Sequence, residues 1–400
     1  MSYPKNMRIL LITNLIYALV LPILELFIGA YILRKSSDTS LVVIYQLFVY
    51  IGIPVAFWIN GKLLRSIKIT HLYSLGMLMS GVSMTIMMFL PVVNITGLSI
   101  AGLVMGCSYG FFWSNRDFLA ISSTNDSNRN FYFSIESFFY TITYIIMPAI
   151  AGFIIMSGET YNLYPAKSAY IFLTVLVFVL TIFASVLVHR GDFTNPKKEP
   201  FVFFKFKKDW YWMLLLGVFK GITQAAIFFF PILLILSFVG DEGSLGGLVS
   251  IGSFLTAIAL YLIGRFSKPE HRIYIFSFGL LVFLIGGLVN ALFFSALGVV
   301  IYQLCNSLSR PLLDASYYPI QLGVIDHIAA IEKRNKFAYI FNHEAGLFVG
   351  RFLGCILFLI SAKLFSPEFA LRYVLVIIAI IQIFSIPVAK KLIRKMKNYK

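Results

Sequence analysis

Charged residues are scarce in this sequence of 400 residues: 12% of the side chains are charged, whereas 59% are hydrophobic. A soluble domain carries about a quarter charged residues. Cysteine is also scarce, because only Cys107, Cys305 and Cys355 are present, each within an apolar stretch. These three give neither a disulfide framework nor the spacing of a metal site. We therefore expect an integral membrane protein that holds no metal and no other cofactor.

Motifs for nucleotide or covalent chemistry are missing as well. The sequence contains no Walker loop, dinucleotide fingerprint or metal-ligand cluster, so ATP does not power the protein directly. The run from Gly106 to Gly110 matches the nucleophile pattern Gly-x-Ser-x-Gly. That pattern requires a strained turn between a strand and a helix, whereas this copy lies in an apolar segment with glycines at helical spacing. We therefore expect that the protein has no catalytic residues and is not an enzyme.

Acidic residues are few, since 17 of them oppose 33 basic residues and leave a net charge of +16. The excess does not form a basic face interleaved with surface aromatics, which excludes a nucleic-acid partner. Most of the basic residues instead fall in alternate connections between apolar stretches and at the two ends. Basic connections face the cytoplasm. The pattern predicts a multi-pass protein of the bacterial cytoplasmic (inner) membrane with both termini cytoplasmic.

Long apolar runs are what the sequence has in abundance. Runs of about 20 residues, the length that crosses a bilayer, predict an all-helical membrane protein with twelve spans in two pseudo-symmetric six-helix bundles. The expected divisions are residues 1–190 for the first bundle, 191–208 for a cytoplasmic linker and 209–400 for the second bundle. An alternative for the linker is a helix lying on anionic lipid headgroups through Phe201, Phe203 and Phe204.

The two halves correspond to one another at a shift of about 200 residues, as in a duplicated six-helix unit. Pro22 in the first span matches Pro231 in the seventh. A glycine and basic residues follow the second span at 61–68 and the eighth span at 264–268. Arg-Asn pairs at 129–130 and 334–335 open the fifth and eleventh spans.

With these features the chain resembles the major facilitator superfamily of secondary transporters along its full length. The family's signature after the second span is Gly-x-x-x-Asp-Arg-x-Gly-Arg-Arg; this sequence keeps Gly61, Arg65 and Lys68 but lacks the acidic residue. The resemblance implies alternating access, with spans one, four, seven and ten lining a central cavity. It also implies a transported small-molecule solute.

Charged side chains inside the spans are the main functional candidates, because each costs at least about 2.5 kcal/mol to insert unless it has a partner or water. One alternative is that Arg310 with Asp314 and Glu344 with Arg351 simply neutralise each other. As proton-coupling residues we expect Glu25, Asp314 and Glu344. Together with polar neighbours, the expected substrate-binding residues are Asn14, Tyr17, Glu25, Tyr140, Tyr144, Lys220, Gln224, Asn306 and Arg310.

A second group of charges lies near the expected cytoplasmic ends of the spans. Asp117 ends the fourth span, from which it can reach Arg65 or Lys68 in the turn after the second span. We expect such a cluster to act as an inner gate rather than a binding site. The expected gate residues are Arg65, Lys68, Asp117, Arg129, Glu136 and Arg351.

These observations favour a secondary active transporter, proton-coupled, that moves a small anionic or zwitterionic organic solute, for example a polycarboxylate or a siderophore-like chelate. One alternative is a proton-driven exporter of multiple drugs or lipophilic cations, with Glu25 as the anchor. Another is a lipid flippase on the same fold. We expect protons and membrane lipids as further partners and a monomer as the working form.

Overall fold

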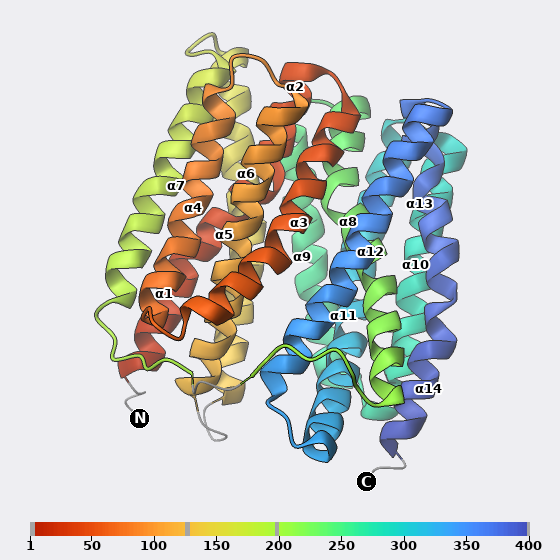
Figure 1. Ribbon diagram of the computed structural model, residues 1–400. Coiled ribbons are helices and arrows are strands. Elements are labelled where there is room, and N and C mark those ends of the chain that lie inside the picture. The colour runs from red at the N-terminus through yellow and green to blue at the C-terminus, as the bar shows by residue number, and fades with distance from the viewer. Residues whose placement is uncertain (1–4, 125–128, 197–199, 398–400) are drawn as a thin grey trace. The chain divides into compact units, whose positions relative to one another are not determined.

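The computed structural model describes residues 5–124, 129–196 and 200–397, and every regular element within these ranges is a helix (Figure 1). The elements are, in order, α1 (Lys5–Pro22), η1 (Ile23–Phe27), α2 (Ile28–Ser36), α3 (Thr39–Leu63), α4 (Ile69–Phe89), α5 (Ile95–Ser122), α6 (Arg129–Thr160), α7 (Ala166–Val188), α8 (Lys208–Phe238), α9 (Glu242–Phe266), η2 (Pro269–His271), α10 (Arg272–Phe293), α11 (Ala296–Glu332), α12 (Lys336–Leu364), α13 (Pro367–Ile383) and α14 (Ser385–Lys397).

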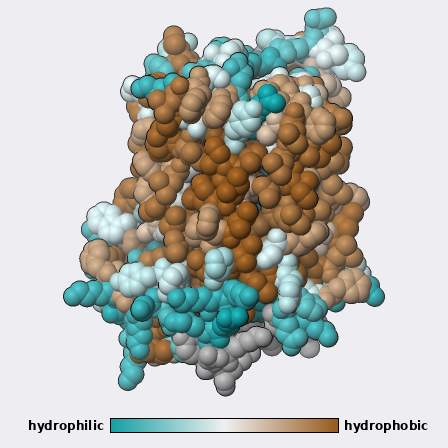
Figure 2. Space-filling view, turned by 90° about the vertical axis from the view of Figure 1, so that its right-hand side faces the viewer, coloured by the Kyte–Doolittle hydropathy of each residue, from teal (hydrophilic) through white to brown (hydrophobic). Residues whose placement is uncertain are grey.

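Eleven of the described helical segments are long and apolar enough to cross a membrane, which confirms the all-helical membrane class. The segment α1–η1–α2 counts as one of them, and α13 continues into α14 as another. Figure 2 shows apolar side chains across the middle of one face and hydrophilic ones toward both ends. Helix α11 is the longest at 37 residues but is not among the eleven; it contains Pro311, Pro319, Arg310 and Asp314. Its polarity fits a helix that borders a cavity rather than lipid.

The chain forms two compact units. Unit 1 comprises Met1–Lys198 together with Asp241–Ser250, and unit 2 comprises Glu199–Gly240 together with Ile251–Lys400. The start of α9 therefore packs within unit 1, although it follows the linker in sequence.

Polar residues at the helix starts explain where several spans begin. The Asp38 side chain accepts a hydrogen bond from the Ser40 backbone N–H at the start of α3, and Asn94 accepts one from Gly97 at the start of α5. Ser295 caps α11 in the same way. Each cap satisfies a backbone donor that the helix itself leaves without a partner.

Glycines bring helices into close contact in each unit. In unit 1 a Cβ at Gly106 of α5 would collide with the backbone of Val49 in α3. In unit 2 a Cβ at Gly350 of α12 would collide with the backbone of Val218 in α8. Small residues are the usual means by which membrane helices approach closely, because lipid supplies no hydrophobic force between them.

The described parts of the linker are extended and held by specific contacts. Asn195 donates to the carbonyl oxygens of Leu64 and Ile67 and accepts from the Ile69 backbone N–H in unit 1. In unit 2 Arg334 donates to the Lys205 carbonyl at 2.7 Å. The backbone from Phe201 to Lys207 is not helical. The alternative of a helix lying on lipid headgroups is therefore wrong; the polar contacts keep this segment on the protein.

The three linker phenylalanines differ in their surroundings. Phe201 is buried with its ring 5.4 Å from that of Phe341, and the Arg334 guanidinium lies 4.4 Å from the centre of Phe203. Phe204 is 89% exposed. Two of the three rings thus pack on the protein.

Candidate functional site

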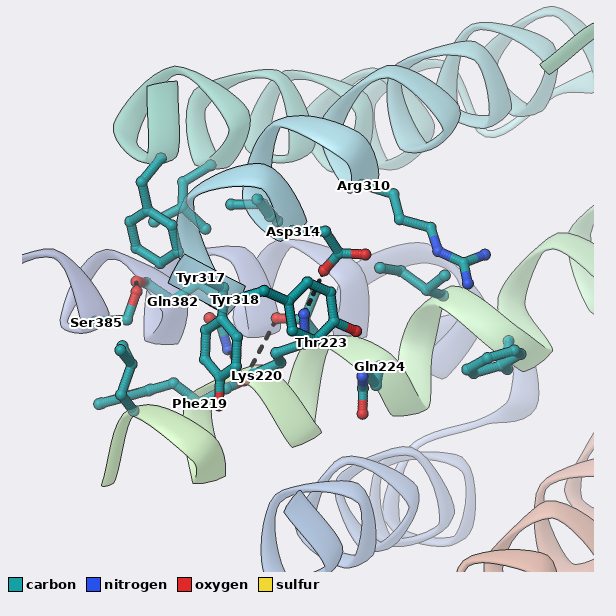
Figure 3. Close-up of a pocket in the computed structure, with 16 residues that line it drawn as sticks. Phe219, Lys220, Thr223, Gln224, Arg310, Asp314, Tyr317, Tyr318, Gln382 and Ser385 are labelled. Atoms are coloured by element: carbon teal, nitrogen blue, oxygen red, sulfur yellow. Dashed lines mark hydrogen bonds and ion pairs between the residues drawn. The ribbon is translucent and has the colours of Figure 1, made fainter. Parts of the chain in front are cut away.

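Unit 2 contains a cavity with about 630 Å³ of empty space, part of which is open to solvent. Helices α8, α10, α11, α13 and α14 all contribute to its walls (Figure 3). Apolar side chains such as Leu216, Phe228 and Phe276 cover much of the lining. A small number of polar and charged groups interrupt it, which is the usual composition of a small-molecule site.

An ion pair lies on the wall of this cavity. Lys220 on α8 donates to the Asp314 carboxylate on α11, and their side chains point toward one another in Figure 3. The Lys220 side chain is 9% exposed, whereas that of Asp314 is 32% exposed. Arg310 also lines the cavity, so its charged lining is two cations and one carboxylate. The spacing of Arg310 and Asp314 suggested that these two pair, but the structure places Lys220 on Asp314.

Aromatic rings complete the surroundings of the Lys220 ammonium. Its nitrogen lies 4.3 Å from the ring centre of Tyr317 and 4.4 Å from that of Tyr318. Cation–π contacts of this kind stabilise a cation that has lost part of its water. The Tyr317 hydroxyl in turn lies 2.5 Å from Nε2 of His343, which is 3% exposed, and Gln321 lies 3.2 Å from Nδ1 of the same ring.

A second ion pair in unit 2 lies along α12. Arg351 donates to Glu344 at 2.6 Å and to the Gln224 side chain of α8 at 3.0 Å. Both charged side chains are close to one-tenth exposed. Gln224 also lines the cavity, so Arg351 holds one of the lining side chains in place.

Unit 1 contains a denser polar network that joins α1, α4, α5 and α6. Arg116 donates through Nε and Nη2 to the two oxygens of Glu136, whose side chain is 1% exposed. Asn14 donates to Glu136 at 2.5 Å and to the Tyr132 hydroxyl at 2.9 Å. Tyr73 donates to the Asn14 side-chain oxygen. The carboxylate therefore has a donor at each oxygen, as a buried charge requires.

The expected gate residues take several different positions. Asp117 pairs with Arg116 at 2.6 Å, which joins it to the Glu136 network instead of to the basic turn after α3. Arg65 and Lys68 are exposed on that turn. The Arg129 side chain lies outside the described residues. Arg351 belongs to unit 2, as described above.

Glu25 occupies a distorted part of the first span. It lies in the π-helical turn η1, directly after Pro22, and accepts a hydrogen bond from the Tyr144 hydroxyl of α6. Single π turns inside α-helices are rare and are frequent at functional sites. The sequence predicted neither this turn nor the contact with Tyr144.

The structure divides the nine expected substrate-binding residues into two groups. Lys220, Gln224 and Arg310 line the unit 2 cavity, whereas Asn306 is 5% exposed and lies one turn away on α11, outside the lining. The other five belong to unit 1. Asn14 is part of the Glu136 network, and Glu25 accepts a hydrogen bond from Tyr144. The ring centre of Tyr17 lies 4.1 Å from that of Phe112, and the ring centre of Tyr140 lies 6.0 Å from that of Trp113.

A third cluster of charges was not predicted. Arg34, at the end of α2, donates to both oxygens of Glu242 at 2.7 Å and to Glu159 at 2.8 Å and 3.0 Å. The Tyr170 hydroxyl donates to Glu242 at 2.8 Å, and Glu242 is 2% exposed. All four residues belong to unit 1. No local pattern in the sequence identifies this cluster, because Glu242 and Glu159 lie 208 and 125 positions away from Arg34 along the chain.

Three aromatic residues of unit 2 were also missed. Tyr317 and Tyr318 follow Asp314 by three and four positions, the spacing that places side chains on one helix face. That spacing is enough to predict from the sequence that both tyrosines lie near Asp314. His343 had no comparable signal, since its partner Tyr317 lies on another helix.

Comparison with known proteins agrees with this architecture. A family model described as Major Facilitator Superfamily matches residues 9–354. The uncharacterized protein YqgE of Bacillus subtilis (strain 168) is 22% identical over 379 residues, which are 94% of this chain and 87% of that protein. An uncharacterized protein in the sodM 3' region of Geobacillus stearothermophilus is 27% identical over 161 residues, covering 38% of this chain and 72% of its own length.

Solved structures share the fold. One, from work on substrate recognition in proton dependent oligopeptide transporters, has a TM-score of 0.71 at 13% identity and covers 99% of both chains. A bacterial homologue of the iron transporter ferroportin also has a TM-score of 0.71, at 14% identity, covering 98% of this chain and all of its own. The family match spans most of the sequence, so this chain is a multi-pass membrane transporter, not an enzyme, and belongs to the Major Facilitator Superfamily.

Proposed function

We propose that this secondary transporter moves a small anionic or zwitterionic organic solute in exchange for, or together with, protons, and that the unit 2 cavity forms part of its binding site. The observation that carries the proposal is the Lys220–Asp314 pair on the cavity wall, with Arg310 on the same lining. Charged groups inside membrane spans commonly mark a transport pathway.

The pair offers a simple chemical link between solute and proton. A carboxylate of the solute that approaches Lys220 competes with Asp314 for the same ammonium group. The second negative charge beside Asp314 disfavours the ionised form of one of the two carboxylates and so favours proton uptake there. Solute binding at Lys220 then promotes protonation of Asp314, which is partly exposed and can exchange protons with water.

The other two carboxylates predicted to couple transport to protons, Glu25 and Glu344, remain candidates, but their surroundings differ from those of Asp314. Glu25 contacts Tyr144, and Glu344 is paired with Arg351. Asp314 differs from Glu344 in its greater exposure and in lining the cavity. We therefore propose Asp314 as the first proton-coupling group to test.

The experiment is a thermal-shift screen of the purified full-length protein, because a ligand stabilises the folded state that binds it. Citrate, succinate, glutamate and dialanine serve as anionic or zwitterionic probes, and tetraphenylphosphonium serves as the lipophilic cation. We expect at least one of the first four to raise the unfolding temperature, and Lys220→Ala to abolish the shift. Lys167→Ala is the matched control, since Lys167 is an exposed cation outside the cavity.

Three outcomes would contradict the proposal. Stabilisation by tetraphenylphosphonium alone would favour the cation exporter. A solute that stabilises Lys220→Ala as strongly as the parent would remove Lys220 from the binding site. Transport of a fluorescent phospholipid in vesicles, with no response to any of the four solutes, would favour the lipid flippase.

The inner-membrane topology is proposed on the charge distribution, with both termini cytoplasmic. A protease-cleavable tag at the C-terminus tests it in spheroplasts. Cleavage is expected only after the membrane is permeabilised.

A further inference from the structure

The last helix, α14 (Ser385–Lys397), has two chemically different faces. Val388, Ala389 and Leu392 are buried in a hydrophobic cluster of unit 2. On the other face Lys390, Lys391 and Arg394 are exposed. The cluster anchors the apolar side of the helix, so its basic side has a fixed position in the unit.

The exposed face of α14 borders a shallow hollow. Its described lining consists of Pro387 and four cations, Lys390, Lys391, Arg394 and Lys395. The carboxylate of Asp209 lies at the edge of this group, where it accepts from Lys395. Four cations held on one helix face repel one another unless an anion lies among them.

The depth of α14 places this hollow at the membrane surface. Helix α13 (Pro367–Ile383) has 17 residues and rises about 25 Å, close to the hydrocarbon thickness of about 30 Å. Helix α14 begins where α13 ends, as Figure 1 shows, so Lys390 lies at the depth of the lipid headgroups. Lys391 also lies 3.6 Å from the ring centre of Trp212, and tryptophan is typical of the interface between lipid and water.

We propose that this hollow binds the phosphate headgroup of an anionic phospholipid. Basic hollows at the cytoplasmic surface of membrane proteins are suited to phosphate groups, and each Lys or Arg near the surface contributes about 1 kcal/mol to the attraction, or roughly fivefold in affinity. The acyl chains of such a lipid continue along the apolar surface at the end of α13, where Ile380 and the C-cap residue Phe384 are exposed. This site is separate from the solute cavity and does not depend on which solute the protein moves.

The test measures lipid retention by the full-length protein in neutral detergent micelles. Palmitoyl-oleoyl phosphatidylglycerol and the matching phosphatidylcholine are added in equal amounts, and native mass spectrometry counts the lipids that remain bound. We expect the parent to retain phosphatidylglycerol preferentially. The variant Lys390→Gln/Lys391→Gln/Arg394→Gln should lower this retention by at least tenfold.

A charge-matched control separates a site from general attraction. Lys205→Gln/Lys207→Gln/Lys208→Gln removes three cations from the linker of the same unit, and we expect less than a twofold loss. Equal losses in both variants would overturn the proposal, because the binding would then follow net charge. If the triple variant does not fold, Lys390→Gln and Arg394→Gln alone remain usable, since both side chains are exposed. Each should lower retention about fivefold.

A second measurement distinguishes the lipid from a soluble anion. Inorganic phosphate at 10 mM is added to the parent carrying phosphatidylglycerol. We expect the lipid to stay bound, because a free phosphate lacks the acyl chains. Displacement of the lipid by phosphate would overturn the assignment to a lipid headgroup and would indicate a soluble anion instead.

Discussion

Both units hold an acid–base pair between helices, yet the two pairs are built differently. In unit 1 Glu136 is 1% exposed and receives donors from Arg116 and Asn14. In unit 2 Asp314 is 32% exposed, accepts a hydrogen bond from Lys220 and lines a cavity. Because Glu136 is buried and bound by Arg116 at both oxygens, a solute cation reaches it only by displacing that partner. The two pairs therefore differ in exposure and in contact with a cavity, and this difference is the reason for proposing the second pair, not the first, as part of a solute site.

The largest expected effect on stability comes from breaking the buried pair of Arg116 and Glu136 in unit 1. Glu136→Ala leaves the Arg116 guanidinium buried without its bidentate partner, which typically costs about 3–5 kcal/mol. We expect unfolding at a much lower temperature or failure to accumulate in the membrane, measured by fluorescence-detected gel filtration. The control is Asp326→Ala, whose carboxylate is 62% exposed and pairs with exposed Lys336. A surface pair of this kind contributes at most about 1 kcal/mol.

The Arg34 cluster extends the comparison within unit 1, because one guanidinium serves two carboxylates of different burial. Glu242 is 2% exposed and also accepts from Tyr170, whereas Glu159 is 47% exposed. We expect Glu242→Ala to lower the free energy of unfolding by about 3 kcal/mol and Glu159→Ala by about 1 kcal/mol or less. Thermal unfolding in detergent measures both. Equal effects would show that burial does not decide the strength of this cluster.

The glycine contacts test whether the two units depend on close helix packing to a similar degree. Gly106→Ala and Gly350→Ala each place a methyl group against a neighbouring backbone, which should cost about 1–3 kcal/mol in either unit. Gly264→Ala in α9 is the control, because nothing lies within 4 Å of its Cβ position. It should leave stability unchanged or raise it slightly. A loss in only one unit would mean that the other can shift its helices.

The sequence predicted the helical class because the length and composition of the apolar runs are local properties. The pair of Glu344 with Arg351, two turns apart on one helix, was one of the alternatives that local spacing suggested, and the structure contains it. Pairs between distant segments were different: Lys220 and Asp314 are 94 positions apart, and Arg34 and Glu242 are 208 apart. Spacing along one helix suggested Arg310 for Asp314 instead. A local pattern contains no information on which helices become neighbours, so these partners required the structure.

The smallest expected effect on stability belongs to the cavity pair, and it is the most informative. Lys220→Met keeps the length of the side chain while removing its charge, and it leaves Asp314 partly in water instead of buried. We therefore expect a change of about 1 kcal/mol or less in the free energy of unfolding. The same variant should lose at least tenfold in affinity for the solute found in the thermal-shift screen. A destabilisation as large as that of Glu136→Ala would place Lys220 and Asp314 with the structural pairs, because a site must tolerate the loss of a contact that its solute is meant to replace.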